Sequence, residues 1–365
     1  MNEKLLMADR IAGFDLARAY AIFGMFIVNF NFCFGSVWQT DEPVGRFLNL
    51  FVGNSTAIFI ILAGMGVSLM AQKCGSEESE IKKTKATILK RSVFLFIIGL
   101  LLFLWWPGDI LHFYGSYMHF AAFMLFVPKR YLLVAAVAAI GVFHILLFII
   151  PIETGWNFSI FQPVDFWTPA GFLRNTFYNG WNSVFPWIAY FFVGMWLGKL
   201  DWTKYIIRRN VFVCGLIVFL STQCLRLLAK QDYFSERATA YIMSEYFPPY
   251  LPFMLITAGF ALMAITAFIV IGQHFKNSKI IGYLAATGRL TLTHYIMHLT
   301  VGMLILSAVT GLDYSGNIQS GIHAAPLYIL SFSIIYFAAT VIVTVLWTRK
   351  FKSGPIEMLM RRFSR

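Results

Sequence analysis

The sequence is poor in charged residues and in cysteine. Only 13% of its 365 residues are Asp, Glu, Lys or Arg, against about 25% in an ordinary soluble domain, while 59% are hydrophobic and the mean hydropathy is +0.70. This composition excludes a soluble enzyme. The four cysteines form no Cys-x-x-Cys pair and no Cys/His metal spacing, so we expect neither a disulfide framework nor a bound metal.

Long apolar stretches bounded by charges recur along the whole chain. At about 20 residues per spanning helix, they predict an all-α polytopic membrane protein, because a helix satisfies its own backbone in lipid. The first stretch shows no signal-peptide cleavage site, so we expect it to be retained. The ten predicted spans, which we expect to form one transmembrane domain over residues 1–365, are 14–32, 49–71, 91–106, 110–127, 131–151, 182–198, 211–229, 250–272, 289–309 and 323–347.

Lys and Arg are divided unevenly between the alternating connections. One side holds 22 of the 29 and the other side four, with the remaining three inside spans. The positive-inside rule makes the richer side cytoplasmic, with both termini, the loop 72–90 and the tail 348–365. The net charge of +12 therefore indicates orientation, and we expect no nucleic-acid partner.

The long outer connection, residues 152–181, is rich in Trp, Phe and Asn. Two interpretations stay open for it. It fits an aromatic belt at the membrane interface, and it also fits a lid over an acceptor site that faces outward. Just after this connection, Gly194-x-x-x-Gly198 indicates close helix packing.

Ionisable side chains inside the spans are candidates for function, because each is costly in lipid. On the first span, Asp15, Arg18 and Asn29 share one helical face. Asp15 and Arg18 fit either a structural ion pair three residues apart at the inner interface or a functional site.

Asp109 and His112 lie one turn apart at the start of the fourth predicted span. An Asp near a His can hold the imidazole tautomer and raise its basicity, which a general base requires. Asp109 alone is equally well explained as a helix cap, but capping does not explain His112.

The ninth predicted span carries Arg289, His294 and His298. The two histidines lie one turn apart on one face and resemble half of a helical metal site, but no Glu lies between them and no third ligand is near. We therefore expect no metal and favour a hydrogen bond between helices for His298.

Several short motifs, in the same order along nearly the whole chain, resemble the YeiB-like proteins that are grouped with the heparan-alpha-glucosaminide N-acetyltransferases in a transmembrane acyltransferase superfamily. The motifs are Arg10-x-x-Gly13-x-Asp15-x-x-Arg18, Met25-x-x-Val28-Asn29, Gly108-Asp109-Ile110-Leu111-x-x-Tyr114, Phe185-Pro186-Trp187-x-x-Tyr190-x-x-x-Gly194-x-x-x-Gly198, Gly288-Arg289-x-x-Leu292-Thr293-x-Tyr295 and Trp347-x-Arg349-x-Phe351-x-x-Gly354-Pro355-x-Glu357.

The resemblance implies transfer of an acyl group, typically acetyl, from cytoplasmic acyl-CoA to a sugar-like acceptor on the far side of the membrane. Asn29 matches the Asn of the family's first span. In the N-acetyltransferase branch a catalytic His follows that Asn by eleven positions, and here this position is Thr40. Another histidine, for which we favour His112, must then supply the base, or this branch does different chemistry.

With the resemblance in view, the polar groups divide by depth in the membrane. The catalytic candidates lie toward the outside, with His112 as base and Asn29 as the group that stabilises the thioester oxyanion; they are His112, Asp109 and Asn29. The acyl-CoA candidates are Arg18, Arg289, Asp15 and His294. The first three lie near the cytoplasmic ends of their helices and His294 lies deeper, with the two arginines as donors to phosphate.

A membrane transporter or flippase for a small metabolite or lipid-linked precursor is the alternative, in which the same residues line a path across the membrane. A non-catalytic subunit of a larger complex is a third interpretation. Against the transporter stand the lack of a detectable repeat and of Gly/Pro-broken helices in matching halves. We expect the chain to lie among lipid in the plasma (inner) membrane of a bacterium; acceptor, acyl length and oligomeric state, a homo-oligomer included, stay open.

Overall fold

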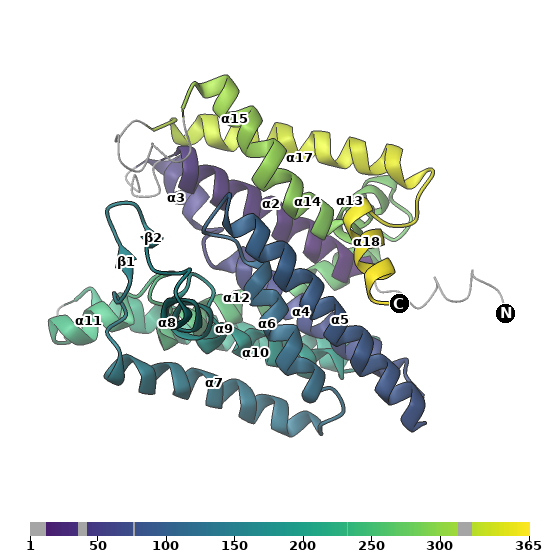
Figure 1. Ribbon diagram of the computed structural model, residues 1–365, viewed down its shortest axis with the longest axis horizontal. Coiled ribbons are helices and arrows are strands. Elements are labelled where there is room, and N and C mark those ends of the chain that lie inside the picture. The colour runs from purple at the N-terminus through teal and green to yellow at the C-terminus, as the bar shows by residue number, and fades with distance from the viewer. Residues whose placement is uncertain (1–11, 36–41, 76, 232, 313–322) are drawn as a thin grey trace. The chain divides into compact units, whose positions relative to one another are not determined.

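The structure, a computed structural model, describes residues 12–35, 42–75, 77–231, 233–312 and 323–365 (Figure 1). Almost all ordered elements in these ranges are helices, and the strands β1 (Trp156–Asn157) and β2 (Gln162–Pro163) form one short antiparallel pair. The predicted all-α polytopic membrane fold is therefore confirmed.

Eight helical segments in the described ranges are long and apolar enough to cross a membrane. They are α2 (Ala12–Phe34), Pro43–Gln72 with α3 (Pro43–Asn49) and α4 (Asn54–Gln72), α5 (Glu78–Phe103), α7 (Lys129–Ile149), α10 (Tyr205–Ala229), α12 (Leu251–His274), Thr291–Thr310 with α14 (Thr291–Met297), η2 (His298–Gly302) and α15 (Met303–Thr310), and α17 (Pro326–Thr348). Each falls on one of the ten predicted spans.

The other two predicted spans, 110–127 and 182–198, form shorter helices, α6 (Leu111–Phe123) and α9 (Val184–Gly198). At 1.5 Å per residue, α6 is about 20 Å long, less than the about 30 Å of a hydrocarbon core. The count of ten spans and the cytoplasmic position of both termini stay predictions.

The chain falls into two compact units. Unit 1 comprises the described residues within 1–59, 208–217 and 259–358, and unit 2 those within 60–207, 218–258 and 359–365. The single transmembrane domain over 1–365 stays a prediction.

In unit 1, α17 runs antiparallel to α2 along a row of aromatic pairs. The backbone N–H of Ala324 donates to the carbonyl of Phe34 (2.7 Å). Further along, ring centroids lie 5.1 Å apart in the Phe30–Phe332 pair and 5.0 Å apart in the Phe23–Phe337 pair. The first and tenth predicted spans thus run in opposite directions, as alternation requires.

The helix α13 (Lys279–Arg289) packs on the start of α2 through a glycine. A Cβ added at Gly288 would lie 1.7 Å from the carbonyl oxygen of Asp15, so the two backbones touch. The sequence offers a matched glycine in the same helix, Gly282, around which a Cβ would meet nothing within 4 Å.

Replacing Gly288 with Ala is expected to lower the thermal unfolding midpoint, whereas Gly282→Ala leaves it unchanged or raises it slightly. Extra methyl groups in a tight contact cost about 1–3 kcal/mol, while Ala in an open helical position is favoured over Gly by about 1 kcal/mol. Thermal unfolding of both variants in detergent measures the difference. Equal midpoints would contradict the packing of α13 on α2.

Unit 2 is also built on close helix contacts at glycine. A Cβ at Gly99 of α5 would lie 2.0 Å from the backbone nitrogen of His112 in α6, and one at Gly194 of α9 would lie 2.1 Å from the carbonyl oxygen of Ile61 in α4. Close packing at Gly194, expected from the sequence, is therefore present. α7 lies along α9 in the same unit.

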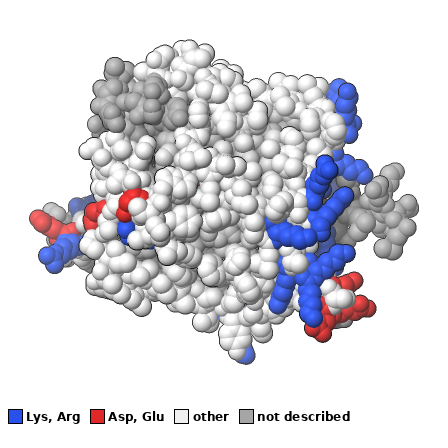
Figure 2. All heavy atoms as spheres, in the orientation of Figure 1, with Lys and Arg blue, Asp and Glu red and all other residues white. Residues whose placement is uncertain are grey.

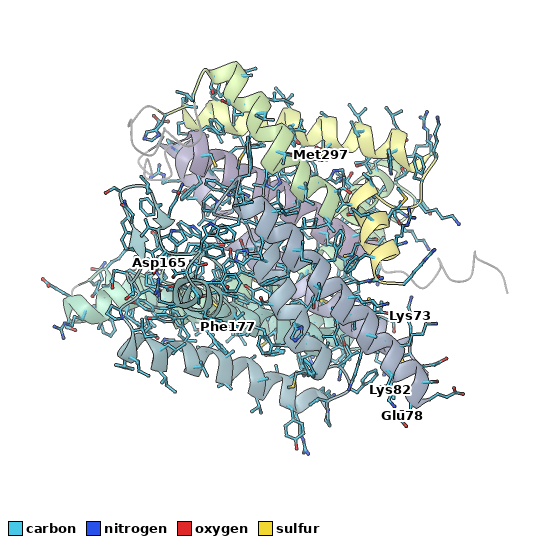
Figure 3. The ribbon with its side chains drawn as sticks, viewed as in Figure 1. Lys73, Glu78, Lys82, Asp165, Phe177 and Met297 are labelled. Carbon is cyan, nitrogen blue, oxygen red and sulfur yellow. The ribbon has the colours of Figure 1, made fainter. Side chains whose placement is uncertain are left out.

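Segments that the charge rule assigns to the cytoplasmic side lie together in unit 2. Lys90 donates to the carbonyl of Arg365 (3.0 Å), and Gln72 donates to that of Gly198 (2.6 Å). Figure 2 shows Lys and Arg gathered around the N-terminal half of α5. Acidic side chains lie beside them, among them Glu78, which pairs with Lys82 at 2.7 Å (Figure 3).

The outer connection has a defined structure of its own. After the β1–β2 pair, one Arg174 nitrogen lies 2.6 Å from each carboxylate oxygen of Asp165, which Figure 3 labels. α8 (Pro169–Arg174) and the π-helical turn η1 (Asn175–Asn179) follow. The amide of Asn179 donates to the carbonyls of Ile152 and Thr154, which ties the two ends of the connection together.

The remaining described helices are α11 (Glu236–Ile242), in unit 2, and α18 (Pro355–Phe363), which begins in unit 1 and ends in unit 2.

Candidate functional site

Asp109 and His112 lie together at the start of α6, and both side chains are fully buried. One carboxylate oxygen of Asp109 accepts from the backbone N–H of Leu111 (2.8 Å) and of His112 (3.2 Å), and lies 3.3 Å from Nδ1 of the imidazole. Asp109 therefore does both things that its sequence position allows: it caps α6 and it holds His112.

The hydrogen bonds of Asp109 favour one tautomer of His112. The carboxylate oxygen that faces Nδ1 already accepts from two backbone N–H groups, so Nδ1–H is the form that adds a third donor to it and leaves the lone pair on Nε2. Nε2 is buried and has no hydrogen-bond partner among the described residues. A neutral imidazole with an available Nε2 is the form that a general base requires.

Aromatic rings surround His112, and one of them comes from the outer connection. The ring lies edge-on to Phe103 (5.5 Å between centroids) and to Phe166 (5.8 Å). Phe166 itself stacks on Phe103, with centroids 3.8 Å apart and planes 20° apart. One residue of the outer connection, Phe166, thus contacts this histidine directly.

The acyl-CoA candidates in unit 1 differ in the ion pairs that they make. Arg18 pairs with Asp15 at 2.6 Å; the Asp15 side chain is 4% exposed and that of Arg18 21%. Arg289, the last residue of α13, is half-buried and makes no ion pair with any described residue. The expected ion pair is present, and Arg289 has no counter-ion in the part of the chain that the structure describes.

The two histidines of the ninth predicted span face different helices. Nε2 of His294 lies 2.8 Å from the hydroxyl of Thr344 on α17. Nε2 of His298 lies 3.0 Å from the amide nitrogen of Asn29 on α2. The hydrogen bond between helices favoured for His298 is present, and its partner is a residue that the sequence singled out for a different reason.

The structure brings together Asp15 with Arg18 and Asp109 with His112, whereas Asn29 and His294 bond to residues outside these two pairs. Asp109 and His112 lie in unit 2, whereas Asn29 lies in unit 1, so a cluster of these three around one acceptor stays a prediction. Thr40 lies outside the described residues. Within the described ranges, no group of three or more His, Cys, Asp or Glu side chains is placed to hold a metal ion.

The sequence profile for the catalytic part of heparan-alpha-glucosaminide N-acetyltransferase matches residues 10–215, more than half of the chain. The chain belongs to this N-acetyltransferase family. A second profile, described as a protein of unknown function and called DUF418, matches residues 191–365. No match was found among curated proteins or among solved structures. The protein is thus an integral, multi-pass member of a membrane acetyltransferase family.

The N-acetyltransferase profile covers the α2 residues and the Asp109–His112 pair, while the DUF418 profile covers the ninth predicted span and the tail. The Asn29–His298 contact therefore joins the two matched regions.

The motif that ends at Glu357 gave no sign that this acid is buried, and the structure shows that it is. Its carboxylate accepts from the backbone N–H (3.1 Å) and the hydroxyl (2.5 Å) of Thr293 at the start of α14. A Cβ at Gly354 would lie 2.3 Å from that carboxylate, so glycine is needed there. Two motifs distant in sequence thus form one contact that fixes the histidine-bearing helix.

Proposed function

We propose that this protein is an acyltransferase of a bacterial plasma membrane that moves an acyl group, in the first instance acetyl, from cytoplasmic acyl-CoA to a sugar-like acceptor on the outer side. Family membership supports the reaction class. The observation that carries the proposal is the buried Asp109–His112 pair, whose tautomer leaves Nε2 able to take a proton.

Arg289 and Arg18 hold the phosphates of acyl-CoA through charge-assisted hydrogen bonds. Arg289 makes no ion pair with a described residue, whereas Arg18 is already paired with Asp15. Arg289 is therefore the principal phosphate donor in this proposal, and Asp15 orients Arg18. His294, which follows Arg289 on the next helix, α14, lines the donor side.

In the acyl step, Nε2 of His112 takes the proton of the acceptor hydroxyl or amine as that oxygen or nitrogen attacks the thioester carbonyl carbon. The new acyl–oxygen or acyl–nitrogen bond forms, the carbon–sulfur bond breaks, and His112 returns the proton to the CoA thiolate. Asn29 donates an N–H to the carbonyl oxygen while it carries negative charge, and Asp109 stabilises the imidazolium.

Acetyl-CoA is expected to raise the unfolding midpoint of the purified protein, because a ligand that binds only the folded form stabilises it by about 2.7 kcal/mol at a hundredfold excess over Kd. Incubation with [14C]acetyl-CoA and D-glucosamine as acceptor probe is expected to give labelled sugar. CoA-free buffer and glucosamine alone are the controls. An unmoved midpoint together with no transfer would favour the transporter or the non-catalytic subunit.

A further inference from the structure

We propose that His298 is a positioning residue that fixes the orientation of the Asn29 carboxamide for acyl transfer. The inference rests on the proposed function, since it concerns the group that stabilises the oxyanion. It starts from a contact between two side chains 269 residues apart, Asn29 on α2 and His298 on η2, both within unit 1.

The hydrogen bonds of His298 leave one orientation for Asn29. Nδ1 of the imidazole lies 3.3 Å from the carbonyl oxygen of His294, which only accepts, so Nδ1 carries the proton. Nε2 of the neutral ring therefore accepts, and the group facing it at 3.0 Å must be the NH2 end of the Asn29 amide. One N–H of Asn29 is used in this bond, and the second N–H donates to no described residue.

The imidazole is held in place by packing. His298 is fully buried. Its ring centroid lies 5.0 Å from that of Phe26, 5.1 Å from that of Tyr295 and 6.1 Å from that of Phe30. Two of these rings come from α2 itself, so the helix that carries Asn29 also fixes the histidine that holds it.

The backbone departs from a regular helix at this point. His298 is the first residue of η2, a single π-helical turn between α14 and α15, and such turns occur often at functional sites. Within η2, a Cβ at Gly302 would lie 2.9 Å from the ring of Phe30. The irregular turn and its glycine thus bring this segment close to α2 beside Asn29.

The orientation of the carboxamide matters because its NH2 group donates hydrogen bonds whereas its oxygen only accepts them. With its NH2 end fixed by His298, Asn29 offers its second N–H to an oxyanion. Without His298, the carboxamide can turn by half a rotation and present its oxygen, which repels a developing negative charge. His298 itself is not the base in this arrangement, because the lone pair of Nε2 already accepts from Asn29.

Two amide variants separate positioning from base catalysis. His298→Gln places a carbonyl oxygen near the position of Nε2, where it can accept from Asn29, whereas the shorter side chain of His298→Asn reaches only toward the His294 carbonyl. We expect His298→Asn to lower kcat by about 10²–10³-fold, the typical loss of one oxyanion donor, and His298→Gln to retain kcat within about tenfold. The KM for acetyl-CoA should change little in either.

A double-mutant cycle tests that the two residues act as a unit. In the background of Asn29→Ala, the further change His298→Asn is expected to cost no additional kcat, because the group it positions is already gone. Additive losses in kcat would overturn the inference.

His144 provides the matched control for stability. Its Nδ1 lies 2.8 Å from the carbonyl of Ile140, one turn back, and its Nε2 lies 2.9 Å from the hydroxyl of Tyr241, so it repeats the bonding pattern of His298 outside the proposed site. We expect His144→Asn to lower the unfolding midpoint and to leave kcat unchanged.

The outcomes that overturn the inference are distinct. Wild-type kcat in His298→Asn would refute positioning while the proposed function stands. Equal loss in the Gln and Asn variants would make His298 the base instead. Absence of acetyl transfer to glucosamine in the wild-type protein, with no shift of its midpoint by acetyl-CoA, would refute the proposed function and the inference with it.

Discussion

Replacing His112 with Ala is expected to lower acetyl transfer by about 10²–10⁴-fold, the usual contribution of a general base. The expectation follows from the tautomer, because Asp109 holds the proton on Nδ1 and Nε2 has no partner among the described residues. Binding of acetyl-CoA should be unchanged, since the base acts only when the acceptor is attacked. Rates of [14C]acetyl transfer and the acetyl-CoA-induced shift of the unfolding midpoint measure the two effects separately.

The same helix offers a control for His112→Ala. His119 lies two turns further along α6 and is exposed, so His119→Ala should leave both transfer and stability unchanged. The result that would refute the assignment is wild-type turnover in His112→Ala with loss in His294→Ala, which would place the base on the ninth predicted span. If no histidine substitution changes the rate, Thr40 at the family's histidine position favours the transporter or non-catalytic subunit.

Most of the fold could be predicted because hydrophobic length is a local property. Eight of the ten predicted spans became long apolar helices. The other two helices are shorter because the chain leaves the helix within an apolar stretch, which hydropathy does not detect. α6 ends at Phe123 and the chain turns over residues 124–127 before Pro128, and the backbone of Phe185 at the start of α9 has extended torsion angles (φ −98°, ψ 126°).

The candidate site was predictable where its partners are close in sequence. Spacing of three residues places Asp15 beside Arg18 and Asp109 beside His112, and both contacts are present. Periodicity identifies a helical face but not the helix it meets. The contact of Asn29 with His298, which joins residues far apart in the chain, therefore needed the structure.

The buried acid of the tail, Glu357, makes a second long-range contact that could not be predicted from the sequence. Glu357 was noted only as part of a motif, because an acid near the chain end gives no sign of burial. Its 64-residue separation from Thr293 hides the fact that it accepts from the first turn of α14. Motif order along the chain indicated the family, whereas the packing shows what these particular residues stabilise.

Replacing Arg289 with Gln is expected to weaken acetyl-CoA binding by about 10–150-fold, which corresponds to the about 1.5–3 kcal/mol of one hydrogen bond to a charged group. The unfolding midpoint without ligand should stay close to wild type, because Arg289 makes no ion pair with a described residue that its loss would leave unpaired. Titration of the midpoint with acetyl-CoA gives the affinity. Arg289→Lys keeps the charge but not the planar guanidinium, so its affinity for acetyl-CoA should lie between those of the wild type and Arg289→Gln.

Arg18→Gln is the informative comparison, because Arg18 and Arg289 differ in their partners. The loss of Arg18 leaves the buried carboxylate of Asp15 without its 2.6 Å ion pair, so we expect a lower midpoint even without ligand. Asp15→Asn in the same chain removes that unpaired charge and should restore part of the midpoint without restoring acetyl-CoA affinity. If Arg18→Gln lowers affinity more than Arg289→Gln at equal stability, Arg18 is the principal phosphate donor. If neither variant changes the affinity, acyl-CoA binds elsewhere on the protein.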